Sequence, residues 1–226
     1  MLSRRPGIGR VVGDVSTGVG LPAAVEGVDA IVHAASDPIK NPKGTDVNGT
    51  ERLAKSGIPV LFVSIVGVDR SPYKYYRCKV EGEQKLRQNA HDWTVLRATQ
   101  FHSFIDRLLN LNLSVANRLP GKPMLIVPRD WRLRPVSHHE VAGRIVELVE
   151  GGPTNSVEQF AGPEEFVSQE LARTWSEVNG GKLITIPSLG GTAAAFKHGA
   201  AVPNEVVPQG SVTWQDFLAG NDFEPI

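Results

Sequence analysis

Short apolar runs that do not alternate with polar residues are the feature that most constrains the fold of this chain. Each run is bounded by turn residues; they are VDAIVHAA (28–35), PVLFVSIV (59–66), WTVLRA (93–98), PMLIV (123–127) and LITIP (183–187). A strand that is apolar at successive positions is buried on both faces, as in a parallel sheet covered by helices. The runs therefore predict the strands of a parallel sheet.

Helical patterns lie between the apolar runs. The segments concerned are 45–57, 76–90, 137–152 and 167–181. Ser137 is the predicted N-cap of the segment 137–152, with Glu140 completing a capping box, and Ser168 is the predicted N-cap of the segment 167–181. Strands that alternate with helices favour βαβ units, so the sequence predicts an α/β fold.

The C-terminal third differs from the rest in its loops. It carries paired glycines and ends in the short segment TWQDFLAG (213–220). We expect residues 1–151 to form the sheet domain and residues 152–226 to form a small C-terminal cap region. A chain of 226 residues is long enough for this arrangement and for a substantial core.

Composition excludes several classes of partner. Lysine plus arginine and aspartate plus glutamate number 24 each, so no overall field attracts nucleic acid. No apolar run is long enough to span a bilayer, and the N-terminus lacks the apolar core of a signal peptide. The one cysteine, Cys78, allows no internal disulfide. We expect a cytoplasmic protein that acts on a small molecule, with no nucleic-acid or membrane partner; its oligomeric state is not indicated.

A possible catalytic set follows the run 59–66. Ser64 lies at the expected carboxyl end of that strand, where open α/β sheets bind ligands. Tyr75 and Lys79 stand four apart at a helix start, so their side chains share one face. A lysine ammonium lowers the pKa of a nearby tyrosine, and a serine hydroxyl can hold a substrate carbonyl. Asn48 could support a proton relay through water.

Each of these residues also has a plainer interpretation. A serine at a strand end is usually a turn residue, and a Tyr-x-x-x-Lys spacing arises readily by chance. The neighbouring Tyr73 and Tyr76 are equally typical of packing aromatics. The order and spacing after a buried strand favour the catalytic interpretation.

The chain resembles the atypical short-chain dehydrogenase/reductases, most closely the NmrA-like NAD(P)-binding group. The resemblance rests, in order, on GDVSTGVGLPAAVEGVDAIVHAAS, DVNGTERL, GIPVLFVSIVGVD with PYKYYRCKVEGEQKL, WTVLRATQFHSFI and RPVSHHEVAGRIVELV. It runs nearly end to end. It implies a Rossmann-type doubly wound parallel sheet of strand order 3-2-1-4-5-6-7 with a small C-terminal substrate region.

The resemblance also implies which residues hold the cofactor. Arg4 and Arg5 resemble the basic pair that receives the 2′-phosphate of NADP, a role suited to the planar fork of arginine. Asp14 is similar to the residue that contacts the adenine, and Lys79 would hold the nicotinamide ribose. The loop beside the riboses would be Ala34, Ala35 and Ser36. The cofactor is therefore expected to be NADP, with NAD less favoured; without the resemblance the two arginines would be interpreted as a solvated terminus.

One element of that family is not found in the sequence. The family's first strand and its glycine-rich turn, which binds the pyrophosphate, would precede Arg4. The segment GIGRVVGDVSTG (7–18) follows the arginines, so it does not replace this strand and turn. Because that strand is central, the sheet is expected to be N-terminally truncated, with two strand edges unpaired. We expect the functional protein to begin upstream of Met1; the alternative is a genuine truncated form.

Other residues invite functional interpretations that remain open. By resemblance, Phe101, His102 and Trp131 would line the substrate pocket, although packing aromatics on a helix are equally expected. His138 and His139 are adjacent and lack further ligands, so no metal site is predicted. Nothing pairs Cys78 with a histidine, so it is not predicted to be a nucleophile.

These observations lead to one preferred function and two alternatives. The first is an NADP-dependent oxidoreductase that reduces a carbonyl, quinone or activated double bond, with Tyr75 as proton donor, Ser64 as polariser and Lys79 as cofactor holder. The second is a dinucleotide-sensing or regulatory protein that binds without turnover. The third is an inactive fragment.

Overall fold

The chain forms two compact units, which are described separately. The computed structural model describes residues 1–116 and 124–221. The first unit comprises Met1–Ser64, Tyr73–Arg97 and Ile145–Glu158. The second comprises Ile65–Pro72, Ala98–Arg144 and Gln159–Ile226. The chain passes between the units several times, so the predicted boundary at residues 151 and 152 does not coincide with this division.

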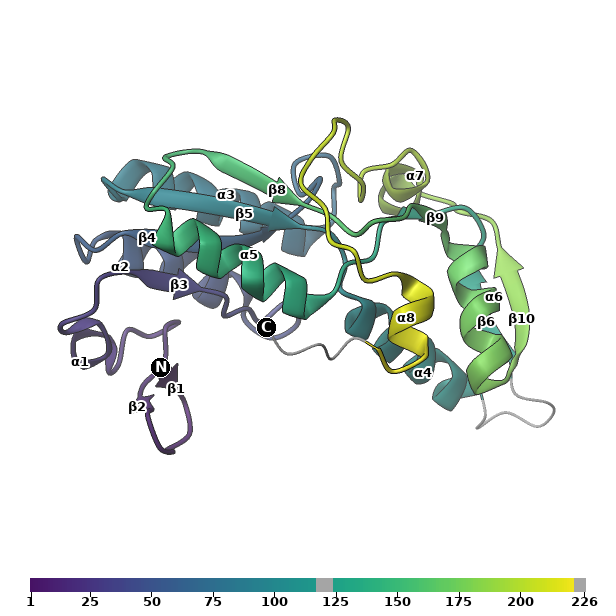
Figure 1. The fold of residues 1–226 in the computed structure, drawn as a ribbon, viewed down its shortest axis with the longest axis horizontal. Coiled ribbons are helices and arrows are strands. Elements are labelled where there is room, and N and C mark those ends of the chain that lie inside the picture. Colours follow the sequence, from purple (N-terminus) through teal and green to yellow (C-terminus); the bar gives the residue numbers. More distant parts are fainter. Residues whose placement is uncertain (117–123, 222–226) are drawn as a thin grey trace. The chain divides into compact units, whose positions relative to one another are not determined.

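A four-stranded sheet forms the centre of the first unit (Figure 1). Its order is β3-β4-β5-β8, for the strands β3 (Ile31–His33), β4 (Val60–Ile65), β5 (Trp93–Ala98) and β8 (Val157–Phe160). β3 and β4 pair in parallel, with Ile31 opposite Val60 and His33 opposite Phe62. Three of the apolar runs thus form neighbouring strands, and the predicted α/β fold with a parallel sheet is confirmed.

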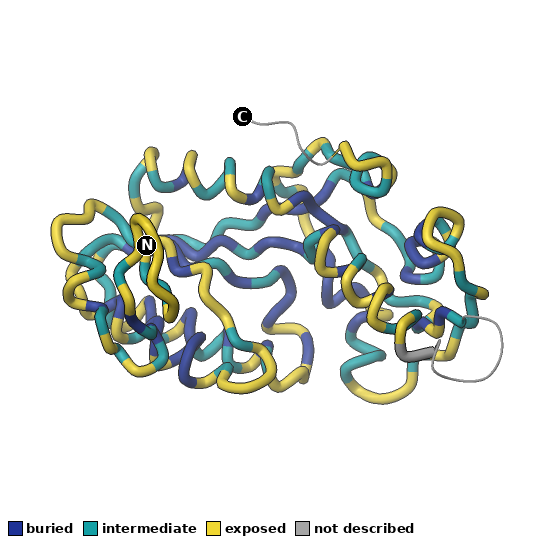
Figure 2. The backbone as a smooth tube through the Cα atoms, turned by 90° about the horizontal axis from the view of Figure 1, so that it is seen from below, coloured by how far each residue is buried: buried dark blue, intermediate teal, exposed yellow. Residues whose placement is uncertain are grey.

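Helices cover this sheet and complete its core. The π-helix η1 (Lys43–Gly49) continues into α2 (Thr50–Ala54), and both pack on α3 (Lys74–Asn89). α1 (Leu21–Val25) is a single short turn. The core side chains come from strands and helices alike; they are Val15, Leu21, Leu53, Ala54, Val60, Phe62, Leu86 and Val95. Figure 2 shows the buried residues gathered along the interior of the fold, whereas the N-terminal loop is exposed.

The N-terminal residues form a separate small sheet. β1 (Leu2–Ser3) pairs in parallel with β2 (Val11–Val12), and neither strand joins the four-stranded sheet. A cavity of about 600 Å³ lies against both β1 and β3. The strand order implied by the family resemblance is therefore interrupted at the position of its first strand.

The second unit is built around another pair of parallel strands. β6 (Met124–Pro128) pairs with β10 (Lys182–Ile186), so the runs PMLIV and LITIP do not join the main sheet. Pro123 lies outside the described residues. α4 (His102–Ala116) and α6 (Ser168–Asn179) pack on this pair, and β7 (Arg132–Leu133) pairs antiparallel with β9 (Phe166–Val167). Two short helices, α7 (Gly191–Lys197) and α8 (Trp214–Leu218), complete the unit.

The capping pattern at residue 137 is present only in part. Ser137 directly precedes α5 (His138–Glu150) and accepts a hydrogen bond from the backbone N–H of His139 at 3.2 Å. Glu140 instead accepts hydrogen bonds from Ser211 and Val212, so it does not close a capping box. The prediction that Ser168 caps the next helix is wrong: the N-cap of α6 is Val167, and Ser168 is the first residue of the helix, because its hydroxyl donates instead to the carbonyl of Pro128 at 2.6 Å. Among the described residues, no helix has the length and hydrophobicity needed to cross a membrane.

Candidate functional site

A hydrogen-bonded network in the first unit joins three separate segments. The Tyr75 hydroxyl lies 2.6 Å from the Ser36 hydroxyl. Ser36 in turn lies 3.0 and 3.2 Å from the two carboxylate oxygens of Asp46. Asp46 forms an ion pair with Lys79 at 2.9 Å. We refer to these four residues as the tyrosine network.

Local structure explains how these side chains meet. Ser36 follows the carboxyl end of β3, while Tyr75 and Lys79 lie one turn apart at the start of α3. Asp46 is presented by η1, and single π-helical turns are frequent at functional sites. Gly82 in α3 permits this approach, because a Cβ there would stand 2.2 Å from the backbone oxygen of Asp46. Sequence analysis therefore predicted Tyr75 and Lys79 together but missed Asp46.

Lys79 is held by several groups in a buried position. Its side chain is 4% exposed, and its ammonium donates to the carbonyl of Val63 at 2.8 Å as well as to Asp46. It also lies 4.5 Å from the centroid of the Phe62 ring. Burial lowers the pKa of Lys79, and the charges of Asp46 and Glu83 oppose that shift. Asp46 and Val63 thus fix the ammonium inside the fold.

The environment of Tyr75 differs from the expected one. Burial raises the pKa of Tyr75, the charge of Asp46 raises it further, and the hydrogen bond with Ser36 acts in the opposite direction. The lowering by Lys79 that the sequence led us to expect is not found. The physical reason is that the ammonium is paired with Asp46 and lies 6.0 Å from the centroid of the tyrosine ring.

Ser64 belongs to a second buried network. Its hydroxyl donates to Glu83 at 2.6 Å, and both residues are almost fully buried. Glu83 also receives two hydrogen bonds from Arg97, at 2.9 and 2.7 Å. Sequence analysis missed Glu83 and Arg97, although a glutamate one helical turn after Lys79 was a signal that the same face continues inward. Asn48 lies two residues beyond Asp46 in η1, and its side chain is exposed.

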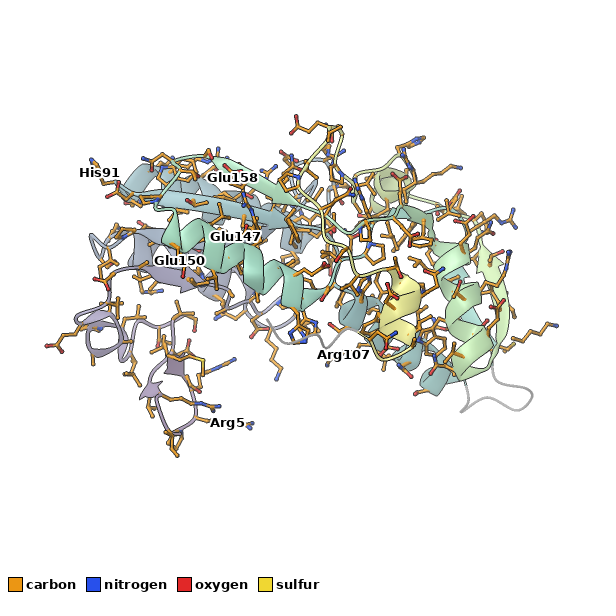
Figure 3. The ribbon with its side chains drawn as sticks, in the orientation of Figure 1. Arg5, His91, Arg107, Glu147, Glu150 and Glu158 are labelled. Atoms are coloured by element: carbon orange, nitrogen blue, oxygen red, sulfur yellow. The ribbon has the colours of Figure 1, made fainter. Side chains whose placement is uncertain are left out.

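Five of the seven predicted cofactor residues lie at the cavity of the first unit. Arg4, Asp14 and the loop Ala34, Ala35 and Ser36 all line it. Arg5 is exposed in the loop between β1 and β2 (Figure 3). Asp14 accepts hydrogen bonds from the backbone N–H and the hydroxyl of Ser16, at 2.8 and 2.7 Å. The hydrogen bond from the Ser16 hydroxyl is the main cause that lowers the pKa of Asp14.

His33 is a further residue of the cavity wall that the sequence did not single out. It is 2% exposed, stacks on Phe62 with centroids 5.1 Å apart, and its Nε2 has no hydrogen-bond partner. Burial lowers the pKa of His33 to about 3, with a smaller contribution from the charge of Lys79. His33 is therefore a neutral ring at ordinary pH.

The residues expected to line a substrate pocket lie in the second unit and pack there. His102 is 1% exposed and lies against Trp214 and Phe217, with centroids 5.8 and 5.3 Å apart. Trp131 stacks on Phe196 at 4.8 Å, and Phe101 lies 6.5 Å from His138. These contacts are those of packing aromatics.

Two sequence features of possible chemical interest are also placed by the structure. His138 and His139 lie side by side, with ring centroids 4.1 Å apart. The described part of the chain contains no group of three or more His, Cys, Asp or Glu residues able to hold a metal ion. Cys78 is half-buried, and burial raises the pKa of its thiol.

Comparison with known proteins supports the fold. No protein-family model matches the sequence, and no curated protein matches it. Among solved structures, the chain is similar to an NADPH-dependent quinone oxidoreductase of Escherichia coli complexed with NADPH (TM-score 0.70, 14% identity, 95% of this chain and 83% of that chain). It is also similar to a nucleoside-diphosphate-sugar epimerase of Staphylococcus aureus (TM-score 0.69, 16% identity, 92% of this chain and 82% of that chain).

A third similar structure is the triphenylmethane reductase of a Citrobacter species complexed with NADP(H) (TM-score 0.63, 17% identity, 96% of this chain and 80% of that chain). At these low identities, the similarity establishes a shared fold. The predicted Rossmann-type α/β architecture is thereby confirmed.

Proposed function

We propose that this chain binds a nicotinamide dinucleotide and is an oxidoreductase that reduces a carbonyl or quinone-like small molecule. The observation that carries the proposal is the position of Ser36. This residue lines the cavity that also carries Arg4 and Asp14, and its hydroxyl lies 2.6 Å from the hydroxyl of Tyr75. A proton donor therefore stands beside a cavity of about 600 Å³, a volume within the ordinary range of ligand-binding sites.

The chemistry of the cavity residues fits NADP better than NAD. Arg4 and Arg5 are exposed at the end of β1, and Arg4 lines the cavity. A guanidinium binds a 2′-phosphate through paired hydrogen bonds, whereas an acidic residue there would favour the free hydroxyl of NAD. Asp14 at the same cavity would contact the adenine, as the family resemblance implies.

The proposed mechanism assigns a task to each member of the tyrosine network. When bound, the nicotinamide supplies the hydride. Tyr75 donates a proton to the substrate oxygen, and Ser36 and Asp46 hold its hydroxyl in place. Lys79 can hold the nicotinamide ribose only if its ammonium turns away from Asp46 and the carbonyl of Val63, to which it now donates. Ser64 can polarise a substrate carbonyl only if its hydroxyl turns away from Glu83, to which it now donates.

Turnover tests the catalytic part of this proposal. The protein is incubated with NADPH and a panel of quinones and aldehydes, and NADPH oxidation is followed by absorbance. We expect Tyr75→Phe to lower kcat by about 100-fold or more, since positioned proton donors contribute about 10² to 10⁴. Tyr73→Phe, which removes a neighbouring hydroxyl, is the matched control. Equal rates for wild type and Tyr75→Phe would contradict the role of Tyr75.

A dinucleotide-sensing protein without turnover is the second candidate. Two observations favour it: burial raises the pKa of Tyr75, and the Ser64 hydroxyl is already engaged by Glu83. Binding of NADPH that is unchanged in Tyr75→Phe, together with no oxidation by any acceptor, would support the sensor and contradict the enzyme.

A further inference from the structure

The small parallel sheet of the second unit has one edge closed by a side chain. In β6, the backbone N–H of Ile126 donates to Oδ1 of Asn112 at 2.9 Å. Nδ2 of the same asparagine donates to the backbone carbonyl of Ile126 at 2.8 Å. A neighbouring strand satisfies an N–H and a C=O in the same way. Asn112, which belongs to α4, therefore takes the place of a strand at the outer edge of β6.

The outer edge of β10 is left open. The carbonyl of Ile186 accepts a hydrogen bond from the N–H of Arg129 at 2.9 Å, so Ile186 directs its backbone toward β6. Because the direction of the backbone groups alternates along a strand, Leu183 and Thr185 direct their N–H and C=O away from β6. In the described part of the chain no strand pairs with this edge, and β10 lies at the margin of its sheet (Figure 1).

The open edge borders an apolar surface. An unpaired strand edge is a template for pairing with another chain, and natural proteins commonly block such edges with a proline, a charged side chain or a covering segment. Residues 183–185, the middle of β10, contain neither a proline nor a charge. Ile126 and Ile186, on the same face of the sheet, are 37% and 46% exposed. The edge is therefore suited to pairing rather than protected from it.

We propose that β10 pairs antiparallel with β10 of a second copy of this chain, about a two-fold axis at Ile184. Leu183 of each copy then lies opposite Thr185 of the other. Their outward N–H and C=O groups form hydrogen bonds across the axis, and the two small sheets become one continuous sheet. This inference concerns the second unit and does not rest on the proposed function.

The side chains of β10 favour a second copy as the occupant. A two-fold contact requires a surface that is complementary to itself. The axis places Ile184 against Ile184 of the other copy, and such an apolar cross-strand pair is stabilising. Lys182, the charged residue of the strand, falls opposite Ile186 of the other copy and not opposite itself. No like charges meet across the axis.

The first test removes one outward backbone donor. The sedimentation velocity of the protein is measured over a range of concentrations, and we expect a reversible dimer. Thr185→Pro deletes the outward N–H, and the residue before a proline favours extended backbone, so the pairing of β10 with β6 is kept. Each dimer loses the hydrogen bonds of both prolines, and we expect its dissociation constant to rise by about 10-fold or more.

Thr185→Val is the matched control for this variant. Valine keeps the backbone N–H and removes only the hydroxyl that Arg129 contacts at 3.4 Å, so the dissociation constant should stay at its wild-type value. A wild-type protein that remains monomeric at its highest soluble concentration would overturn the proposal and leave the edge to a different partner. A dimer that Thr185→Pro does not weaken would place the interface elsewhere and would overturn it as well.

A charge exchange at Ile184 tests the two-fold register directly. Ile184→Lys and Ile184→Glu each place like charges opposite one another, so each variant alone should be monomeric. An equimolar mixture of the two places a lysine opposite a glutamate, and we expect the dimer to return. Circular dichroism verifies that both variants are folded. Absence of a mixed dimer between folded variants would contradict the proposed register, and the proline variant decides the pairing if either variant does not fold.

Discussion

At the scale of single residues, the tyrosine network depends on the ion pair of Lys79 with Asp46, two residues that are distant in the sequence. The four-residue spacing of Tyr75 and Lys79 is readable from the chain, and the structure places both on the first turns of α3. The partner of Lys79, however, comes from η1, and its carboxylate cancels the expected influence of the ammonium on the tyrosine. A residue pattern can reveal which side chains share a face, but not which opposite charge will meet them.

His33 provides a prediction about pH. Its pKa is about 3 in the folded chain and about 6.5 when unfolded, so the unfolded chain binds a proton first as the pH falls. The stability contributed by the neutral ring is therefore complete above pH 6.5 and is lost progressively toward pH 3. We expect the free energy of unfolding to fall by about 1 kcal/mol per pH unit from this residue between pH 6 and 4.

Denaturant titrations of wild type and His33→Gln at several pH values measure this contribution. The difference in free energy of unfolding between the two proteins should change with pH in that window, and the variant should be the less pH-sensitive. His91→Gln, an exposed histidine in the same unit, is the control. Parallel curves for wild type and His33→Gln would show that His33 is not buried as described.

At the scale of elements, the long buried strands could be predicted from the sequence, whereas the short strands and the π-helix could not. The run WTVLRA has the same bounds as β5, and the run PVLFVSIV contains β4. A parallel strand that is buried on both faces is apolar at successive positions, so it can be found in the sequence. β7, β8 and β9 were missed because strands of two to four residues, among which only Phe160 is buried, are too short to leave a periodic signal. The π-helical form of η1 was also missed, because the predicted segment 45–57 was treated as one regular helix.

The contact between η1 and α3 can be tested at Gly82. A methyl group at this position would stand 2.2 Å from the backbone oxygen of Asp46, so α3 must shift relative to η1. Overpacking of this kind typically costs about 1–3 kcal/mol. We expect Gly82→Ala to lower the free energy of unfolding by that amount, despite the higher helix propensity of alanine. Gln84→Ala, at an exposed position of the same helix, is the control and should leave the free energy of unfolding nearly unchanged. An unchanged or higher free energy of unfolding in Gly82→Ala would contradict the close packing of α3 on η1.

At the scale of the molecule, the interruption between β1 and β3 is the main departure from a continuous doubly wound sheet. The cavity at this interruption carries Arg4, Asp14 and Ser36, which were predicted from resemblance and which lie far apart in the sequence. Their convergence on one cavity depends on tertiary structure and is invisible in any local pattern. The sequence alone also did not indicate that β6 and β10 would pair apart from the main sheet, because their apolar runs resemble those of β4 and β5.

The central claim is that this cavity binds a phosphorylated nicotinamide dinucleotide, and calorimetric titration of the protein with NADPH tests it most directly. We expect saturable binding at one site, with NADH bound at least about tenfold more weakly, a difference of about 1.4 kcal/mol. Arg4→Ala should reduce the affinity for NADPH and leave that for NADH unchanged. Absence of binding of either nucleotide to the folded protein at millimolar concentration, or affinities for NADPH that Arg4→Ala does not alter, would contradict the account.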